Sequence, residues 1–182
     1  FKRRESVGDA LLRVTRERVR WARERLETGK DPVRVVHEVR KQCKMIRGAL
    51  RLVRPADEDL YARENRSYRD VARLLAPYRD TDVARSTLRA LRSRTDDTAE
   101  RKLLSRLGAS LKQVRAPSDA RRREMFTQAN TALADAEARV ADWRTEGWDQ
   151  AHVEQGLLDG YQRARRAMEK AYGQPSLSSF HE

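Results

Sequence analysis

Apolar residues recur every three or four positions along nearly the whole chain, and this spacing limits the fold more than any other feature. It places apolar side chains on one side of an α-helix, whereas a half-buried strand would show strict alternation. The 182 residues include only 8 Gly and 5 Pro, which is too little turn-forming material for an all-β fold. The sequence therefore predicts an all-α fold.

Capping residues, glycines and prolines divide this pattern into separate helices. Asp31-Pro32 combines an N-cap with a proline in the first turn, and Pro55 prevents the helix that follows from continuing. Short links between long helices predict antiparallel neighbours and hence helical bundles. The expected helices span residues 7–27, 32–53 and 57–76, then start at 80 and 97, and finally span 118–147 and 149–173.

The charge balance favours an anionic partner. Lys and Arg number 40 against 28 Asp and Glu, giving a formal charge of +12. Nucleic acid, a phosphate polymer and an acidic membrane surface all match that charge. No stretch is apolar enough to span a membrane, and no signal-peptide region is visible. With Cys43 as the single cysteine, predicted to be a packed thiol, a cytoplasmic location is expected.

Residues 36–54 combine an apolar seam with a basic ridge. At about 100° per residue, the cations of this segment fall in a narrow sector beside its Val, Ile and Leu side chains. Acidic residues are nearly absent from the sector, although a merely solvated face normally interleaves both signs. The ridge consists of His37, Arg40, Lys44, Arg47 and Arg51, with Lys41 at its flank.

A second basic stripe follows on the next helix. Asn65, Arg69 and Arg73 stand at successive i+4 steps, with Arg66 beside them. Two antiparallel neighbours would bring both stripes together, and guanidinium groups grip phosphate oxygens well. The ridge carries no aromatic residue to stack on bases. A phosphate-only polymer therefore suits it best, with nucleic acid as the alternative and a solvated face as the non-functional interpretation.

Three segments resemble one known family, the CHAD (conserved histidine α-helical) domains. They are VHEVRKQCKMIRGALRLVR, ENRSYRDVARLLAPYRDTDV and GLLDGYQRARRAM, and the terminal FHE resembles the start of the family's second histidine motif. The resemblance implies two pseudo-symmetric helical bundles around a basic surface that binds inorganic polyphosphate without catalysis. It also implies a fused or neighbouring triphosphate-tunnel (CYTH-type) enzyme and a place at polyphosphate granules.

Carried over residue by residue, the resemblance implies a set of phosphate-contacting positions and two units. Residues 1–116 would form the first bundle and 117–182 the start of the second. The sequence stops where the second basic helix should begin, so the second half is expected to be incomplete, through shortening or through completion by a partner. The implied contacts are His37, Arg40, Lys41, Lys44, Arg47, Arg51, Asn65, Arg69, Arg73, Arg79, Tyr161, Arg165, Arg166 and His181.

No pattern predicts catalysis, a metal site or a cofactor. The chain has no glycine-rich phosphate loop, no GxSxG, no HExxH and no acidic cluster suited to magnesium. His37 could be a phosphate donor when cationic, a structural side chain, a metal ligand or a phosphoacceptor. An enzyme that processes polyphosphate is the remaining alternative to a binding module.

Overall fold

The structure is a computed structural model that describes residues 5–113 and 118–173, apart from the side chains of 79–82 and 111–113. Every regular element in that part of the chain is an α-helix, which confirms the all-α prediction. The helices are α1 (Val7–Thr28), α2 (Pro32–Leu52), α3 (Glu58–Leu74), α4 (Ala76–Arg94), α5 (Thr98–Gln113), α6 (Asp119–Val140) and α7 (Gln150–Gly173).

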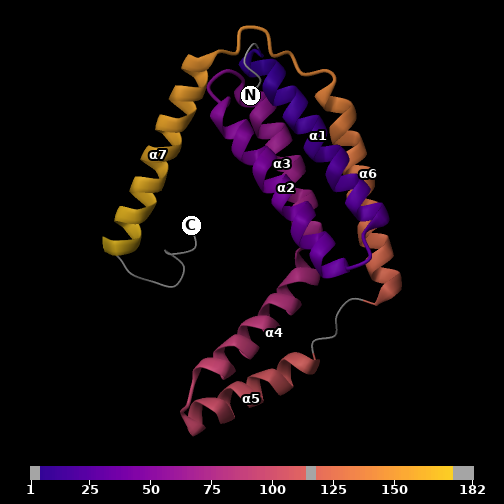
Figure 1. Ribbon diagram of the computed structural model, residues 1–182. Helices are drawn as coiled ribbons and strands as arrows, with labels where there is room; N and C mark the ends of the chain where they lie inside the picture. Colours follow the sequence, from indigo (N-terminus) through magenta and orange to yellow (C-terminus); the bar gives the residue numbers. More distant parts are fainter. Residues whose placement is uncertain (1–4, 114–117, 174–182) are drawn as a thin grey trace.

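Four helices, α1, α2, α3 and α6, pack side by side into one bundle (Figure 1). Their buried side chains form one hydrophobic cluster, in which Tyr68, Ile46 and Leu50 are among the largest fully buried members. The apolar seam predicted for α2 lies entirely within this core. Its residues are Val35, Val39, Cys43, Ile46, Leu50 and Val53.

Side-chain caps start the bundle helices where the sequence predicted them. Asp31 accepts a hydrogen bond from the backbone N–H of Val33, and Ser118 accepts one from that of Arg121. The predicted start of the fourth helix at Asp80 is wrong. That helix begins at Ala76, because Pro77 falls in its first turn, where the missing N–H costs no helical hydrogen bond.

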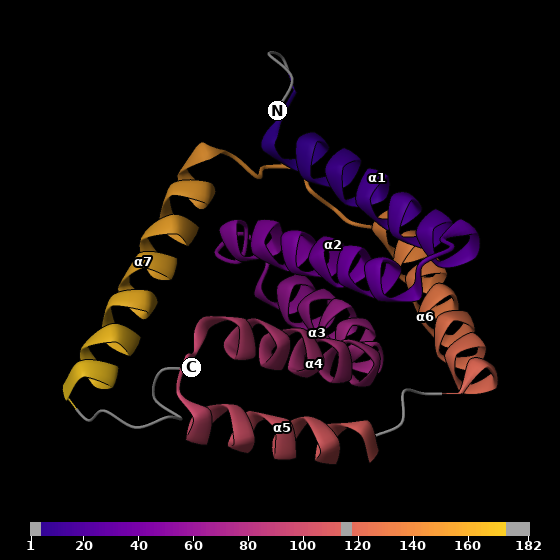
Figure 2. The same ribbon diagram turned by 60° about the horizontal axis from the view of Figure 1, so that its bottom comes forward.

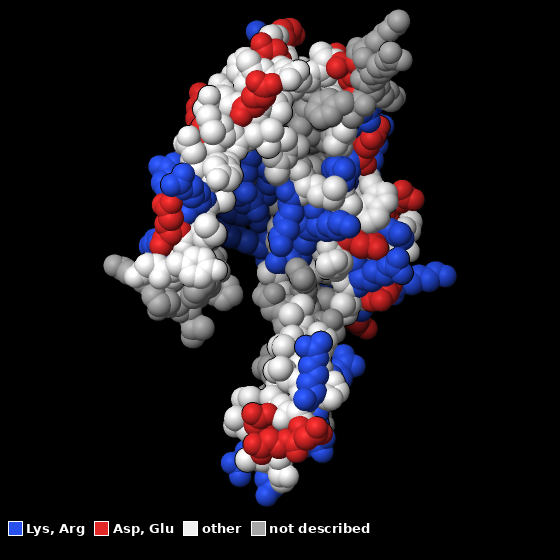
Figure 3. All heavy atoms as spheres, turned by 60° about the vertical axis from the view of Figure 1, so that its left-hand side comes forward, with Lys and Arg blue, Asp and Glu red and all other residues white. Residues whose placement is uncertain are grey.

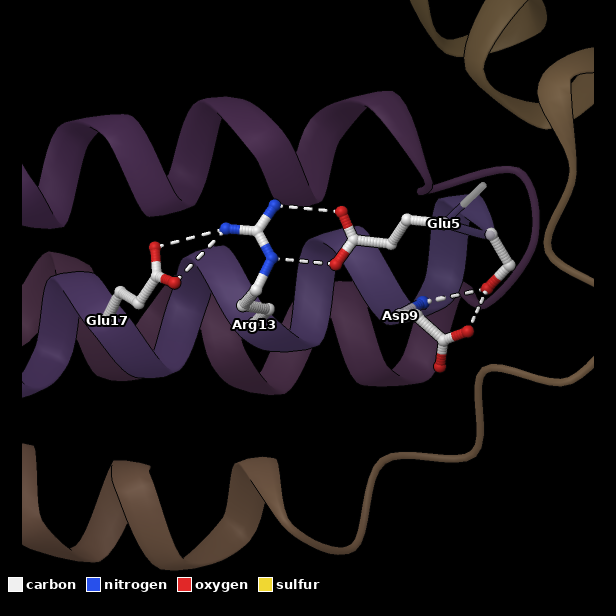
Figure 4. A network of polar contacts seen from close by, with 5 residues as sticks. Glu5, Asp9, Arg13 and Glu17 are labelled. Carbon is white, nitrogen blue, oxygen red and sulfur yellow. Dashed lines mark hydrogen bonds and ion pairs between the residues drawn. The ribbon is translucent and has the colours of Figure 1, made fainter. Parts of the chain in front are cut away.

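At the start of α1 a surface arginine is paired with acids (Figure 4). The Arg13 guanidinium donates to both carboxylate oxygens of Glu5, at 2.7 and 2.8 Å, and also to Glu17. Ser6 caps the helix by accepting from the backbone N–H of Asp9. Arg13 is therefore neutralised by two acids on its own segment.

The helix α6 belongs to the same bundle. It packs against α1 and α3, and Ala129, Leu133 and Val140 lie in the shared core. Arg139 donates to both carboxylate oxygens of the fully buried Glu64 on α3, at 3.1 and 3.2 Å. The helix α6 thus lies in the same bundle as α1 and α3. The division of the chain into a first unit of residues 1–116 and a second unit of residues 117–182 stays a prediction.

Two parts of the molecule project from the bundle. The helices α4 and α5 form a hairpin, and α7 leans away on another side (Figures 1 and 2). Both parts expose large apolar side chains, including Leu103 and Leu107 on α5. The stripe predicted for α7 is also largely exposed, with Leu157, Tyr161 and Met168 more than half accessible. Helical periodicity was correct here, but Leu157, Tyr161 and Met168 do not join the core, and only Val153 of this stripe packs against it among the described residues.

Candidate functional site

Three arginines at seven-residue steps connect α2 and the segment after it to α3. Arg40 donates to the backbone carbonyl of Ala72, Arg47 donates to Asn65 Oδ1 at 2.8 Å, and Arg54 pairs with Glu58. Their acceptors on α3 run in the opposite direction at the same spacing, as antiparallel neighbours require. This register places the two predicted basic stripes on one side of the helix pair.

Arg47 lies at the centre of the shared side. Burial lowers the pKa of its guanidinium from the ordinary value, and the nearby cations Arg51 and Arg69 lower that pKa further. Arginine remains cationic in spite of such shifts. Positive groups from both helices therefore act on Arg47. An anion placed among them would relieve that repulsion.

Most cations around Arg47 have no acid to neutralise them. Lys41, Lys44 and Arg51 are exposed on α2, and Arg66 and Arg73 are exposed on α3. None of these five side chains forms an ion pair with another described residue, in contrast to Arg13. Arg69 does pair with Asp70, at 3.1 Å. Together these side chains form the α2–α3 cationic face, which consists of Lys41, Lys44, Arg47, Arg51, Asn65, Arg66, Arg69 and Arg73.

Arg40 differs from the rest of its ridge. Its Nη1 lies 2.5 Å from the Ala72 carbonyl in the last turn of α3, and its Nε is buried without a partner among the described residues. A cation at a helix C-terminus satisfies an orphan carbonyl and complements the helix dipole. Arg40 therefore acts first as a structural cap, which angular position alone did not reveal.

His37 lies exposed at the start of the α2 ridge. The adjacent acid does not neutralise the ridge, because Glu38 pairs with Arg34 on α2 and Arg25 on α1. Among the described residues, no group of three or more His, Cys, Asp and Glu side chains could hold a metal ion.

The helix α7 adds two cations beside the end of α2. A hollow of about 280 Å³ is lined by Arg163, Arg166 and Asp159 of α7, by Arg54 and Pro55 of the α2–α3 link and by Glu58 of α3. Figure 3 shows Lys and Arg side chains lining the recess between α7 and the bundle. Sequence reasoning missed Arg163. Its signal was Gly156, seven residues earlier, since a glycine inside a helix often marks a close approach.

The α7 residues that the sequence predicted to contact phosphate differ in how they are placed. Tyr161 is 66% exposed, and Arg165 pairs with Glu169 on its own helix at 2.8 Å. Arg166 lines the hollow but also donates to the backbone carbonyl of Gln162. The side chain of Arg79 and all of His181 lie outside the described residues.

These observations define a class: an all-α protein with a cationic face on two antiparallel helices, in which five exposed cations have no acid partner among the described residues. A family model, the CHAD domain, matches residues 10–182. The chain belongs to the CHAD domain family, a family linked to polyphosphate binding and generally non-catalytic. No curated protein and no solved structure matches the chain. No helix in the described part is long and apolar enough to cross a membrane.

Proposed function

We propose that the α2–α3 cationic face binds inorganic polyphosphate and that the chain performs no reaction on it. One observation carries the proposal: five exposed cations on two neighbouring helices have no acid partner among the described residues. Like charges at helical neighbour positions cost stability, so an unneutralised cluster suits a ligand that supplies many negative charges. Family membership supports the same ligand class.

The residues divide into two roles. Lys44 and Arg51, which are exposed and form no ion pair with another described residue, would contact phosphate oxygens directly, and His37 would add a donor when it is cationic. Arg40 and Arg47 hold α2 against α3 and so fix the spacing between the cations. Arg163 and Arg166 would extend the contact across the recess. A flexible polymer could pass between α7 and the bundle and meet both sets.

Nucleic acid is the alternative polyanion, and the aromatic residues argue against it. Tyr61 neighbours Arg47, but its ring is covered by the Arg54 guanidinium, which lies 5.1 Å from the ring centroid. A ring covered in this way is not free to stack on a base. The face also holds a single amide, Asn65, and its oxygen already accepts from Arg47. The face therefore offers few side chains that could form hydrogen bonds to base edges.

A competition assay at fixed salt tests the proposal. Polyphosphate should displace labelled duplex DNA at a much lower phosphate concentration than unlabelled DNA does, and its affinity should fall steeply with salt. Lys44→Glu with Arg51→Glu should weaken binding by at least about tenfold. The control is Lys102→Glu with Arg106→Glu on α5, which changes net charge equally. Equal loss in both variants would count against a specific face.

The non-catalytic part of the proposal has its own test. Incubation of the chain with polyphosphate and Mg²⁺ or Mn²⁺ should leave the polymer length unchanged. If an activity that shortens or lengthens polyphosphate copurifies with the chain, the non-catalytic part of the proposal is overturned, but the binding part is not. On the same proposal, the module would act by recruitment, bringing the chain to polyphosphate granules or a triphosphate-tunnel enzyme to the polymer.

A further inference from the structure

The α4–α5 hairpin carries a second group of cations, apart from the α2–α3 cationic face. A hollow of about 410 Å³ lies between its two helices and is lined by Arg89, Arg92 and Ser93 of α4 and Arg101 of α5. The 19 residues of α4 span about 28 Å, and the hollow lies toward the end that points away from the bundle (Figure 1). It is therefore a distinct location.

The charge pattern of α4 differs from that of a simple solvated face. From Val83 to Arg94 the helix holds four arginines and no acid, whereas solvated helices usually mix both signs. Arg89 and Arg92 are exposed and form no ion pair with any described residue. Figure 3 shows a column of Lys and Arg side chains on the hairpin, with Asp and Glu gathered nearer its tip.

The acids at the tip are engaged locally. Asp97 accepts from the backbone N–H of Ala99, and Glu100 accepts from the Thr95 hydroxyl. Asp96 pairs with Arg101 at 3.3 Å, while Arg101 Nε donates to the Thr95 carbonyl at 2.9 Å. These contacts orient the Arg101 guanidinium, and no described acid is left to neutralise Arg89 and Arg92.

We propose that this hollow on the α4–α5 hairpin is a second binding site for the same phosphate polymer. The inference rests on the proposed function and adds a dependence on polymer length. A short oligomer occupies only the α2–α3 cationic face. A polymer long enough to follow α4 reaches Arg89 and Arg92 as well, and the second contact is then intramolecular, so affinity rises without a second free ligand.

Arg89→Glu with Arg92→Glu tests the site, with tripolyphosphate and a polymer of about 100 phosphates as the two probes. Affinity for the long polymer should fall by about tenfold or more and its salt dependence should become shallower, while affinity for tripolyphosphate should change by less than about twofold. Both side chains are exposed, so helix content and the melting temperature should stay near those of the wild type.

Lys102→Glu with Arg106→Glu is the matched control, since it makes the same charge change on the same hairpin but outside the hollow. An equal loss of long-polymer affinity in this control would reduce the effect to net charge and overturn the site. Unchanged long-polymer affinity in the Arg89 and Arg92 variant would overturn it too, while leaving the α2–α3 face intact. If the wild type binds neither probe, the proposed function fails and the second site falls with it.

Discussion

Gly156 of α7 lies directly against the backbone carbonyl of Leu52 in the last turn of α2. A Cβ at Gly156 would come within 2.2 Å of that carbonyl oxygen and within 2.8 Å of the Leu52 Cα. Backbone cannot yield as a flexible side chain can. This single contact therefore sets how closely α7 approaches the bundle, and with it the position of Arg163 and Arg166 beside the α2–α3 link.

Gly156→Ala should consequently displace α7. We expect a loss of about 1–3 kcal/mol of stability, as for other overpacked sites, and weaker polyphosphate binding because the two α7 arginines move. Gly160→Ala is the control, since a Cβ there meets nothing within 4 Å. It should raise stability by up to about 1 kcal/mol through helix propensity alone. Urea unfolding and polyphosphate-binding isotherms of both variants test this prediction. Equal stability and equal affinity in the two variants would refute a role for the contact between Gly156 and Leu52 in placing α7.

Substitutions of Arg40 and Lys44 should have different effects, one on stability and the other on polyphosphate binding, although the two residues are neighbours on one ridge. Arg40→Ala removes the donor to the Ala72 carbonyl and should cost about 1–3 kcal/mol of stability. Lys44→Ala should leave the melting temperature nearly unchanged and weaken polyphosphate binding, because Lys44 is exposed and unpaired among the described residues. Thermal melts and titrations of the two variants check this. A reversed pattern would mean that Lys44 is the structural residue.

Arg47→Lys tests whether the fork geometry matters at the centre of the face. Lysine keeps the charge but presents no planar set of donors, so it cannot donate to Asn65 Oδ1 and to a ligand in the same arrangement. We expect polyphosphate affinity to fall by several-fold with a small change in stability. Arg66→Lys is the comparison, since Arg66 is exposed and forms no hydrogen bond or ion pair with another described residue. Equal affinity in both variants would show that charge alone operates at Arg47.

The α2 seam and its ridge could be predicted because helical rotation fixes the angular position of each residue, and one side must be buried. The roles of Arg40 and Arg47 could not, since they depend on where the carbonyl of Ala72 and the amide of Asn65 fall on a neighbouring helix. The exposed stripe on α7 makes the same point. Periodicity predicts an apolar side but not what packs against it.

The contact between α1 and α6 should depend on pH through Glu137. Its carboxylate accepts from Arg20 at 2.9 Å and from Arg23 at 2.6 Å. Burial alone would raise the pKa of Glu137, but the hydrogen bonds from Arg23 and Arg20 outweigh it and hold the pKa below the ordinary value of 4.5. A depressed folded-state pKa stabilises the fold above the unfolded pKa, and this stability is lost as the pH falls through the folded pKa.

Urea unfolding of the wild type and of Glu137→Gln at pH 7 and in acid measures this contribution. The variant should be less stable at pH 7 and should lose less stability on acidification. Glu124→Gln on the same helix should change stability by less than about 0.5 kcal/mol at pH 7, because its pair with Arg121 is half exposed. If the wild type and Glu137→Gln lose the same stability on acidification, the ion pairs of Glu137 with Arg20 and Arg23 contribute nothing to the stability of the fold.

Cys43 provides a reporter of opening between α2 and the core. Its thiol is fully buried, and burial raises its pKa from 9.0 to about 12, against the lowering effect of Arg47 and Arg40. At pH 8 the thiolate population is then about a thousandfold smaller than at the ordinary pKa, and the reagent must also wait for the fold to open. A thiol reagent should therefore label Cys43 far more slowly than a cysteine introduced at the exposed Ser105.

Saturating polyphosphate should slow the labelling of Cys43 further, because a ligand that binds only the folded chain lowers the population of the open state. Labelling of Cys43 as fast as that of the Ser105→Cys thiol would contradict the closed core, and a rate indifferent to polyphosphate would contradict coupling between the ligand and the α2 helix.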